Sequence, residues 1–224
     1  ADNELFRQGY FHVEGQASQL AALCVDAQPG ETVIDLCAAP GGKSSQLAAA
    51  LQGRGVLVSN EYVAARAEIL KSNLERMGVS NAVVLNETPA RIAEALPEFF
   101  DRVLVDAPCS GEGMFRKEPV ALQQHCEALV KQCAELGAQI LDCAAAALAP
   151  GGQLVYSTCT IDPAENQQQI AAFLARHPEF TVVEPAAALP AGMTAGEHGC
   201  LSVPTRTGMD GFFLCVLQKA AATQ

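Results

Sequence analysis

Short apolar runs alternate with longer helical patterns along the chain, and this alternation constrains the fold more than any other feature. Seven runs have the length and apolar content of β-strands: 32–36, 56–60, 82–85, 102–105, 153–156, 180–183 and 211–217. Helical patterns precede and separate most of them, at 18–27, 43–51, 64–77, a short stretch from 89, 120–148 and 164–176. Regular alternation predicts a mostly parallel sheet with helices on both faces. The last two runs have no helix between them, which predicts an antiparallel insertion at the sheet edge.

The composition supports one α/β domain. Half of the 224 residues are hydrophobic, which is enough for a sizeable buried core. We expect residues 1–30 to form a lead-in with a helix that packs on the main domain, which we place at 31–220. The longest apolar run, 141–154, is interrupted by Asp142, Pro150 and Gly151, so no transmembrane helix is expected. The first residues, Ala-Asp-Asn-Glu, lack the basic-then-apolar order of a secretory signal.

The charge and the cysteines exclude several classes of protein. Lys and Arg number 14 against 25 Asp and Glu, so the net charge is −11 and bulk charge cannot hold nucleic acid. The nine cysteines are odd in number and show no Cys-x-x-Cys spacing. We therefore expect neither a disulfide framework nor a metal site, and a reducing cytoplasm fits this usage.

A turn of small residues, Asp35-Leu36-Cys37-Ala38-Ala39-Pro40-Gly41-Gly42-Lys43, follows the first predicted strand. Gly and Ala let a ligand approach the backbone, and the N-terminus of the next helix offers amide donors to an anionic group. The turn matches neither the dinucleotide motif nor the phosphate-binding loop of nucleotide triphosphatases. Its alternative interpretation is a tight strand–helix connection without a ligand.

An acid, Glu61, directly follows the second predicted strand, 24 residues after Cys37. A carboxylate at this place in an α/β sheet can accept hydrogen bonds from both hydroxyls of a ribose. The alternative is a solvated loop acid. Together with the small-residue turn, Glu61 predicts a ligand that contains adenosine.

Two cysteine motifs follow the fourth and fifth predicted strands. They are Asp106-Ala107-Pro108-Cys109-Ser110-Gly111-Glu112-Gly113 and Tyr156-Ser157-Thr158-Cys159-Thr160. If these strands are neighbours, Cys109 and Cys159 project into one pocket. Cys-Ser-Gly-Glu-Gly also fits the nucleophile turn of a hydrolase, but none of the four histidines falls in these motifs. A cysteine hydrolase would need a histidine within reach of Cys109.

The motifs DLCAAPGGK, DAPCSGEG and YSTCT, in this order, resemble those of the S-adenosylmethionine-dependent RNA cytosine-5 methyltransferases. The segment GEGMFRK at 111–117 is most similar to the bacterial branch that modifies 16S ribosomal RNA. The similarity runs from 6–10 to the last predicted strand. The resemblance implies a Rossmann-like class I methyltransferase fold, with a mostly parallel seven-stranded sheet, helices on both faces and an antiparallel edge insertion.

The resemblance also implies roles for particular residues. The residues that would hold S-adenosylmethionine are Cys37, Ala38, Ala39, Pro40, Gly41, Gly42, Lys43 and Glu61. Asp106 would touch both the cofactor and cytosine, Cys159 would be the nucleophile, and Cys109 would help to release the product. Thr88 stands where the family usually has an Asp near the adenine, so the adenine contact there departs from the family pattern.

The chemistry explains why two thiols and an acid are needed. Carbon 5 of cytosine becomes nucleophilic when a thiolate adds to carbon 6. Asp106, protonated or hydrogen-bonded at ring nitrogen 3, would disperse the charge that develops there. The attacking cysteine needs a lowered pKa, and Lys43 is the nearest cation by motif.

The expected partner is RNA. Ribosomal RNA is the first expectation and transfer RNA the second, with the product 5-methylcytosine. Arg116 and Lys117 form the one adjacent basic pair of the sequence and are candidates for phosphate contacts, although a solvated loop is the alternative. No separate RNA-binding domain is evident, and we expect a cytoplasmic monomer. The alternative function is a noncatalytic RNA- or ribosome-binding module that retains the fold.

Overall fold

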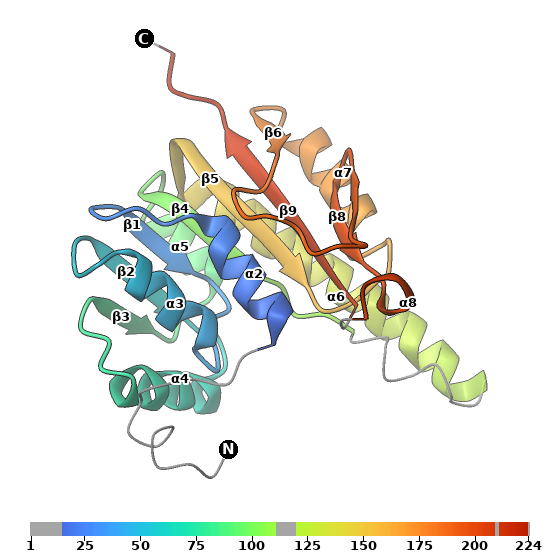
Figure 1. The fold of residues 1–224 in the computed structure, drawn as a ribbon, viewed down its shortest axis with the longest axis horizontal. Helices are drawn as coiled ribbons and strands as arrows, with labels where there is room; N and C mark the ends of the chain where they lie inside the picture. The colour runs from blue at the N-terminus through green and yellow to red at the C-terminus, as the bar shows by residue number, and fades with distance from the viewer. Residues whose placement is uncertain (1–14, 111–119, 209–210, 224) are drawn as a thin grey trace.

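A nine-stranded mixed sheet forms the centre of the computed structural model, which describes residues 15–110, 120–208 and 211–223 (Figure 1). The strands run in the order β3-β2-β1-β4-β5-β9-β8-β7, and β6 pairs with β9. Their bounds are β1 Thr32–Asp35, β2 Val56–Asn60, β3 Ala82–Leu85, β4 Phe100–Asp106, β5 Leu148–Thr158, β6 Phe180–Val183, β7 Thr194–Gly196, β8 Gly199–Ser202 and β9 Phe212–Lys219. The Rossmann-like class of fold expected from the sequence is thus confirmed.

The parallel half of the sheet contains β3, β2, β1, β4 and β5. Parallel strands joined by right-handed crossovers place all their carboxyl ends at one edge of the sheet. The strands β4 and β5 are neighbours, with Val105 opposite Tyr156 and Asp106 opposite Ser157. The condition under which the two cysteine motifs would meet, that they follow neighbouring strands, is therefore fulfilled.

The antiparallel half of the sheet is built around β9. This strand pairs with β5 on one side and with β6 and β8 on the other. The prediction of seven strands missed β7 and β8, because their Gly-, Ala- and Thr-rich sequence has little strand propensity of its own. Pairing with β9 supplies the strand structure, and Gly199 fits because a Cβ there would lie 2.4 Å from the Phe213 ring.

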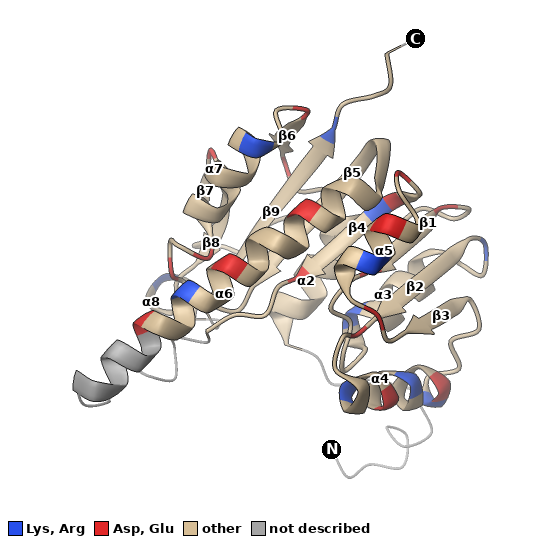
Figure 2. Ribbon diagram, turned by 180° about the vertical axis from the view of Figure 1, so that it is seen from behind, with Lys and Arg blue, Asp and Glu red and all other residues tan. Residues whose placement is uncertain are grey.

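Helices cover both faces of the sheet. Their bounds are α2 Gln16–Val25, α3 Gly42–Ala50, α4 Ala64–Arg76, α5 Pro89–Ala95, α6 Val120–Ala147, α7 Gln167–Arg176 and α8 Pro204–Thr207. The helices α2 and α3 lie on the face seen in Figure 1, and α5, α6 and α7 lie on the opposite face, seen in Figure 2. Successive strand residues are buried on opposite faces, as in Val33 and Ile34 of β1. This double burial explains why the strands are apolar throughout rather than alternating.

The helix α7 begins at Gln167, three residues later than predicted. The backbone N–H of Glu165 donates to the Asp162 carbonyl at 3.2 Å, and the N–H of Asn166 donates to the Pro163 carbonyl at 3.2 Å. These bonds form a turn, and both Glu165 and Asn166 are buried. The helix thus begins after this turn, in which the side chains of Glu165 and Asn166 lie inside the protein.

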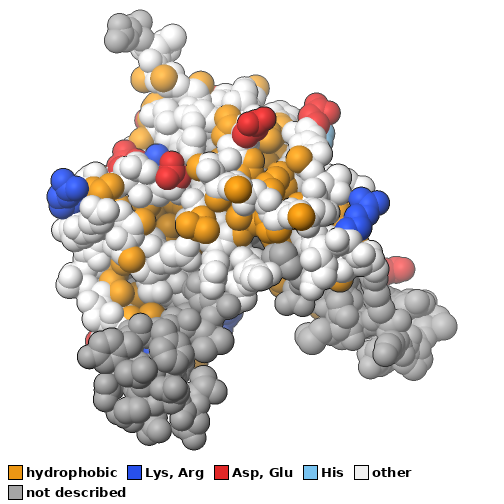
Figure 3. Space-filling model, viewed as in Figure 1, with side chains coloured by type: hydrophobic (Ala, Val, Ile, Leu, Met, Phe, Trp, Pro, Cys, Tyr) orange, Lys and Arg blue, Asp and Glu red, His pale blue; other side chains and the backbone are white. Residues whose placement is uncertain are grey.

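Among the residues that the structure describes, no helix is both long and apolar enough to cross a bilayer. Hydrophobic side chains gather near the middle of one face, over α2 and the connection that follows β6 (Figure 3). Leu23 of α2 is 55% exposed. No group of three or more His, Cys, Asp and Glu in the described part is placed to hold a metal ion.

Candidate active site

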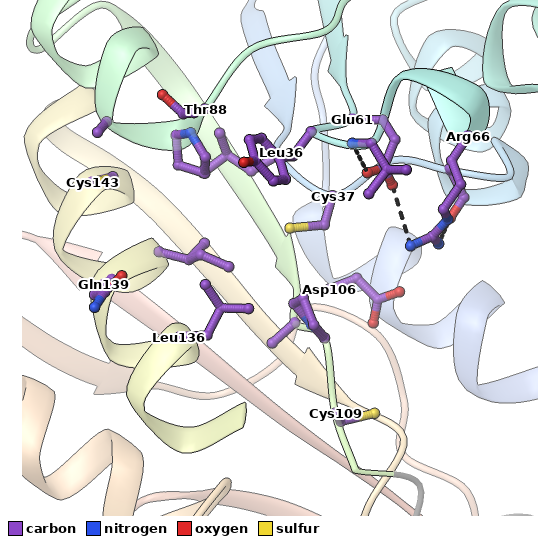
Figure 4. Close-up of a pocket in the computed structure, with 18 of the residues that line it drawn as sticks. Leu36, Cys37, Glu61, Arg66, Thr88, Asp106, Cys109, Leu136, Gln139 and Cys143 are labelled. Atoms are coloured by element: carbon purple, nitrogen blue, oxygen red, sulfur yellow. Dashed lines mark hydrogen bonds and ion pairs between the residues drawn. The ribbon is translucent and has the colours of Figure 1, made fainter. Parts of the chain in front are cut away.

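A cavity of about 700 Å³ opens where the loops after the parallel strands meet (Figure 4). Its volume lies within the ~300–1,000 Å³ usual for small-molecule sites. The side chains that line it are Leu36, Cys37, Ala39, Glu61, Tyr62, Val63, Arg66, Thr88, Pro89, Ala90, Asp106, Ala107, Pro108, Cys109, Leu136, Gln139, Ile140, Cys143 and Cys159. Residues predicted from four separate motifs therefore share one cavity.

Of the small-residue turn, Leu36, Cys37 and Ala39 line the cavity, whereas Ala38, Pro40 and the residues 41–43 at the start of α3 are not among its lining residues. The Ala38 N–H donates to the Asn60 carbonyl at 2.8 Å, and the Asn73 amide donates to the Pro40 carbonyl at 2.8 Å, so the loop is fixed from two sides. Gly41 has φ 120°, and a Cβ there would lie 3.1 Å from Leu70 Cδ1. Gly41 is also the N-cap of α3, and no described side chain caps this helix. Its first-turn N–H groups are therefore available to an anionic ligand group.

Glu61 lines the cavity, and its carboxylate is held by Val63 and Arg66. The side chain is 7% exposed. Its Oε2 accepts a hydrogen bond from the Val63 N–H at 3.0 Å, and its Oε1 lies 3.7 Å from an Arg66 nitrogen (Figure 4). Both oxygens retain lone pairs for further hydroxyl donors.

Thr88 reaches the cavity from the start of α5. Its Oγ1 accepts a hydrogen bond from the Arg91 N–H at 3.2 Å and caps that helix. The hydroxyl proton remains for donation to a ligand. The apolar side chains of the cavity include Pro89, next to Thr88 in the chain, and Leu136 and Ile140 of α6. Such walls suit a planar base with a few polar edges.

Asp106 lies between Cys37 and Cys109 at the end of β4 (Figure 4). Its Oδ1 accepts a hydrogen bond from the Ser157 hydroxyl at 2.9 Å, and its Oδ2 lies 2.7 Å from Lys43 Nζ. Lys43 also donates to the Ser18 hydroxyl at 3.1 Å. Lys43 was expected to be the cation that lowers the pKa of the attacking cysteine. In the structure its ammonium group pairs with Asp106 instead.

Cys109 and Cys159 meet at the ends of β4 and β5 and form a disulfide, with their Cα atoms 6.3 Å apart. The Cys159 N–H also lies 3.2 Å from Cys109 Sγ. The expectation that both cysteines enter one pocket is confirmed. The expectation of no disulfide is wrong for this pair, because strand pairing brings together residues 50 positions apart, which sequence spacing does not reveal.

Cys37 is a third cysteine of the cavity, with its sulfur directed into it (Figure 4). Burial raises the pKa of Cys37 well above its usual range, and the nearby carboxylates of Asp35 and Asp106 raise it further. Cys37 therefore remains a protonated thiol. Cys143 of α6 also lines the cavity, and burial raises its pKa as well. Among the described cysteines of the cavity, only Cys109 and Cys159 are bonded to each other.

Asp35 is the buried acid beneath the small-residue turn. Its Oδ2 accepts from the Ser44 hydroxyl at 2.8 Å, and its Oδ1 has no hydrogen-bond partner within the described part of the chain. Burial raises the pKa of Asp35 to about 7, while Ser44 and Lys43 oppose the rise. The pKa of Asp35 therefore lies near neutral pH, well above the ordinary value of an aspartate carboxyl.

Sequence reasoning missed two residues of the site, Glu165 and Asn166. Burial raises the pKa of Glu165, and its two hydrogen bonds from Ser110 oppose that rise. The signal available in the sequence was an acid and an amide, six and seven residues after Cys159, at the start of a helix. Such residues often turn back to satisfy loop backbone.

Two further predictions have simple outcomes. Arg116 and Lys117 lie outside the described residues, so the structure says nothing of their phosphate contacts. The cavity lining contains no histidine among the described residues. A cysteine hydrolase built on Cys109 therefore lacks its base there.

Comparison with known proteins decides the family. The family described as 16S rRNA methyltransferase RsmB/F matches residues 22–218. The chain belongs to this family. It is 40% identical over 221 residues to the ribosomal RNA small subunit methyltransferase F of Cronobacter sakazakii, an alignment that covers 96% of this chain and 46% of that protein. The chain thus spans about half the length of the curated RsmB/F relatives it matches.

Solved structures support the methyltransferase fold. The chain is 34% identical to the crystal structure of PH0851, with a TM-score of 0.86 over 97% of this chain and 49% of that one. It is 28% identical to a methyltransferase homolog protein from Pyrococcus horikoshii, with a TM-score of 0.80 over 97% of this chain and 70% of that one. The methyltransferase fold expected from the motifs is therefore confirmed.

Proposed function

We propose that this RsmB/F member is the catalytic part of an RNA (cytosine-5) methyltransferase that acts on small-subunit ribosomal RNA. The observation that carries the proposal is the meeting of Cys109 and Cys159 beside Asp106, in a cavity that also has the features of a nucleotide site. The name of the Cronobacter sakazakii relative supports ribosomal RNA as the substrate. We place the catalytic domain at 31–220, the lead-in at 1–30, and the protein in the cytoplasm as a monomer.

S-adenosylmethionine fits the residues of the cavity. The free amides at the start of α3 match its carboxylate, Glu61 matches the ribose hydroxyls, and the apolar walls near Thr88 match the adenine. The residues that would hold it are those of 37–43 together with Glu61, Thr88 and Asp106. When bound, this group supplies an electrophilic methyl group.

Cys159 begins the reaction on the RNA base. Its thiolate forms a bond to carbon 6 of cytosine, and the electron pair of the 5,6 double bond moves toward carbon 5 and the ring. Asp106 in its protonated form meets the ring at nitrogen 3 and donates its proton there as the negative charge develops, and the Lys43 cation beside Oδ2 stabilises the carboxylate that this leaves. The proton returns to Asp106 when the product forms. Carbon 5 thereby becomes able to accept a methyl group.

Cys109 completes the reaction. As a base it takes the proton from carbon 5, the electrons of that bond restore the 5,6 double bond, and the bond between carbon 6 and Cys159 breaks to return the thiolate. Both steps need free thiols. The disulfide form is therefore inactive, and turnover begins once a reductant has converted the pair to two thiols.

Removal of each cysteine in turn tests this division of labour. With S-adenosylmethionine, reductant and unmethylated 16S ribosomal RNA, Cys109→Ala should give a denaturant-resistant protein–RNA band, because release fails after attack. Cys159→Ala should give neither band nor methylation. Cys133→Ala, on α6 outside the lining residues, is the matched control and should behave as the unmodified chain.

The outcomes separate the alternatives. A band with Cys159→Ala in place of Cys109→Ala reverses the two roles. Methylation that survives in both variants rules out thiol catalysis. No methylation by the unmodified chain, on either ribosomal or transfer RNA, favours the noncatalytic RNA- or ribosome-binding module.

A further inference from the structure

Two consecutive buried residues have no part in the proposed chemistry, yet they contact the loops that carry both cysteines. Glu165 is 1% exposed and Asn166 is 0% exposed. They lie between β5 and α7, in the turn that delays the start of α7. A buried carboxylate and a buried amide are retained in a fold only where they are hydrogen-bonded, so their partners indicate what they do.

Glu165 holds the residue next to Cys109. Its Oε1 accepts a hydrogen bond from the Ser110 N–H at 3.0 Å, and its Oε2 accepts one from the Ser110 hydroxyl at 2.6 Å. The backbone of Glu165 is fixed in turn, because its carbonyl accepts from the buried Tyr156 hydroxyl at 2.6 Å. Two charge-assisted bonds to one residue fix both the position and the direction of the loop.

Asn166 holds the residues on either side of Cys159. The Thr158 hydroxyl donates to Asn166 Oδ1 at 2.6 Å, and Asn166 Nδ2 donates to the Thr160 carbonyl at 3.0 Å. One side chain therefore bridges the loop whose tip is Cys159. Because Glu165 and Asn166 are adjacent in the chain, both cysteine loops share one short anchor.

We propose that Glu165 and Asn166 are positioning residues that set the separation of the two thiols. Glu165 acts through Ser110 on Cys109, and Asn166 acts through Thr158 and Thr160 on Cys159. The catalytic meaning of this separation rests on the proposed function, in which the two thiols act in turn on one cytosine. The separation itself is a property of the protein and can be measured without RNA.

Closure of the Cys109–Cys159 disulfide in a glutathione redox buffer gives that measurement. The two protein thiols lose two electrons and two protons to one glutathione disulfide, which becomes two glutathione molecules. Glu165→Gln leaves only one oxygen to accept from the two Ser110 donors. The equilibrium constant for closure, from mass spectrometry of the cross-linked peptides, should fall about tenfold, which corresponds to about 1.4 kcal/mol.

The matched control is Glu75→Gln, which removes the same charge from an exposed position on α4 and should leave the constant unchanged. Ser110→Ala removes only the hydroxyl donor and should lower the constant by a smaller factor. If Glu165→Gln does not fold, the closure constant of Ser110→Ala tests the proposal in its place. A constant equal to that of the unmodified chain in the folded variants overturns the proposal.

Catalysis then separates the two residues. Glu165→Gln should keep its single-turnover methylation rate, slow in multiple turnover and accumulate the protein–RNA adduct, because it disturbs Cys109. Asn166→Asp should slow the single-turnover step about tenfold without accumulating adduct, since its carboxylate cannot donate to the Thr160 carbonyl. The same defect in both variants would refute separate anchoring. If the redox shift appears but the unmodified chain does not methylate RNA, the proposed function fails while the anchor stands.

Discussion

Substitution of Glu61 by Ala tests the cofactor end of the cavity most directly. The carboxylate is buried, and its partners are the Val63 N–H and Arg66, so its remaining lone pairs are available to a ligand in the cavity. Loss of hydrogen bonds from two ribose hydroxyls to a charged acceptor should cost about 1.5–3 kcal/mol. The dissociation constant for S-adenosylhomocysteine, the demethylated product, should therefore rise about 10- to 150-fold in titration calorimetry.

The loss of affinity in Glu61→Ala should come from lost contacts to the ligand and not from a less stable fold. Val63 is 45% exposed, so its freed N–H can be hydrated, and Glu61→Ala should unfold within a few degrees of the unmodified chain. Glu68→Ala removes an exposed carboxylate from α4 and is the matched control, with unchanged affinity.

A ligand without the 2′ and 3′ hydroxyls completes a double-mutant cycle with Glu61→Ala. If Glu61 binds the ribose, the unmodified chain should lose affinity for this ligand, and Glu61→Ala should lose little more. An equal loss on both ligands would mean that Glu61 acts through the loop and not on the ribose. Unchanged affinity for S-adenosylhomocysteine would refute the placement outright.

Two further predictions follow from titration and redox state. Because burial raises the pKa of Asp35 to about 7, the protonated form favours the folded state; this stabilisation is present below pH ~4 and is lost as pH rises through about 7. Asp35→Asn should therefore raise the unfolding temperature more at pH 8 than at pH 5, and equal gains at both would contradict this. Methylation should also require a thiol reductant, because the disulfide withholds Cys109 and Cys159; full activity of the oxidised chain, verified by thiol titration, would contradict the mechanism.

Much of the fold could be predicted from local sequence. The runs that form β1 and β4 are apolar on both faces because helices cover both sides, so strand and burial appear together in one short segment. The topology then places the end of every parallel strand at one edge, which is why Cys37, Glu61 and Cys109 lie in a single cavity. The features that could be predicted are those that depend on residues close together in the sequence.

The rest depends on contacts between distant residues. The strands β7 and β8 are held by β9 and not by their own propensity. Lys43 was assigned by motif, but its partner is decided by Ser18 and Asp106, which approach from α2 and β4. From the sequence alone, Glu165 cannot be told from a solvated acid near a helix start. In the structure Ser110, 55 residues earlier, donates two hydrogen bonds to it.

The arrangement also makes the proposed tests independent of one another. Glu61 follows β2, whereas Cys109 and Cys159 follow β4 and β5, and β1 lies between the two groups in the sheet. The Glu61 carboxylate contacts Val63 and Arg66, whereas the cysteine loops are held by Glu165 and Asn166, and changes at sites without shared partners are usually additive. Glu61→Ala should thus weaken cofactor binding and leave disulfide closure intact, while Glu165→Gln should do the reverse. Such a double dissociation would show that the cavity has a binding end and a thiol end, each built by its own loops.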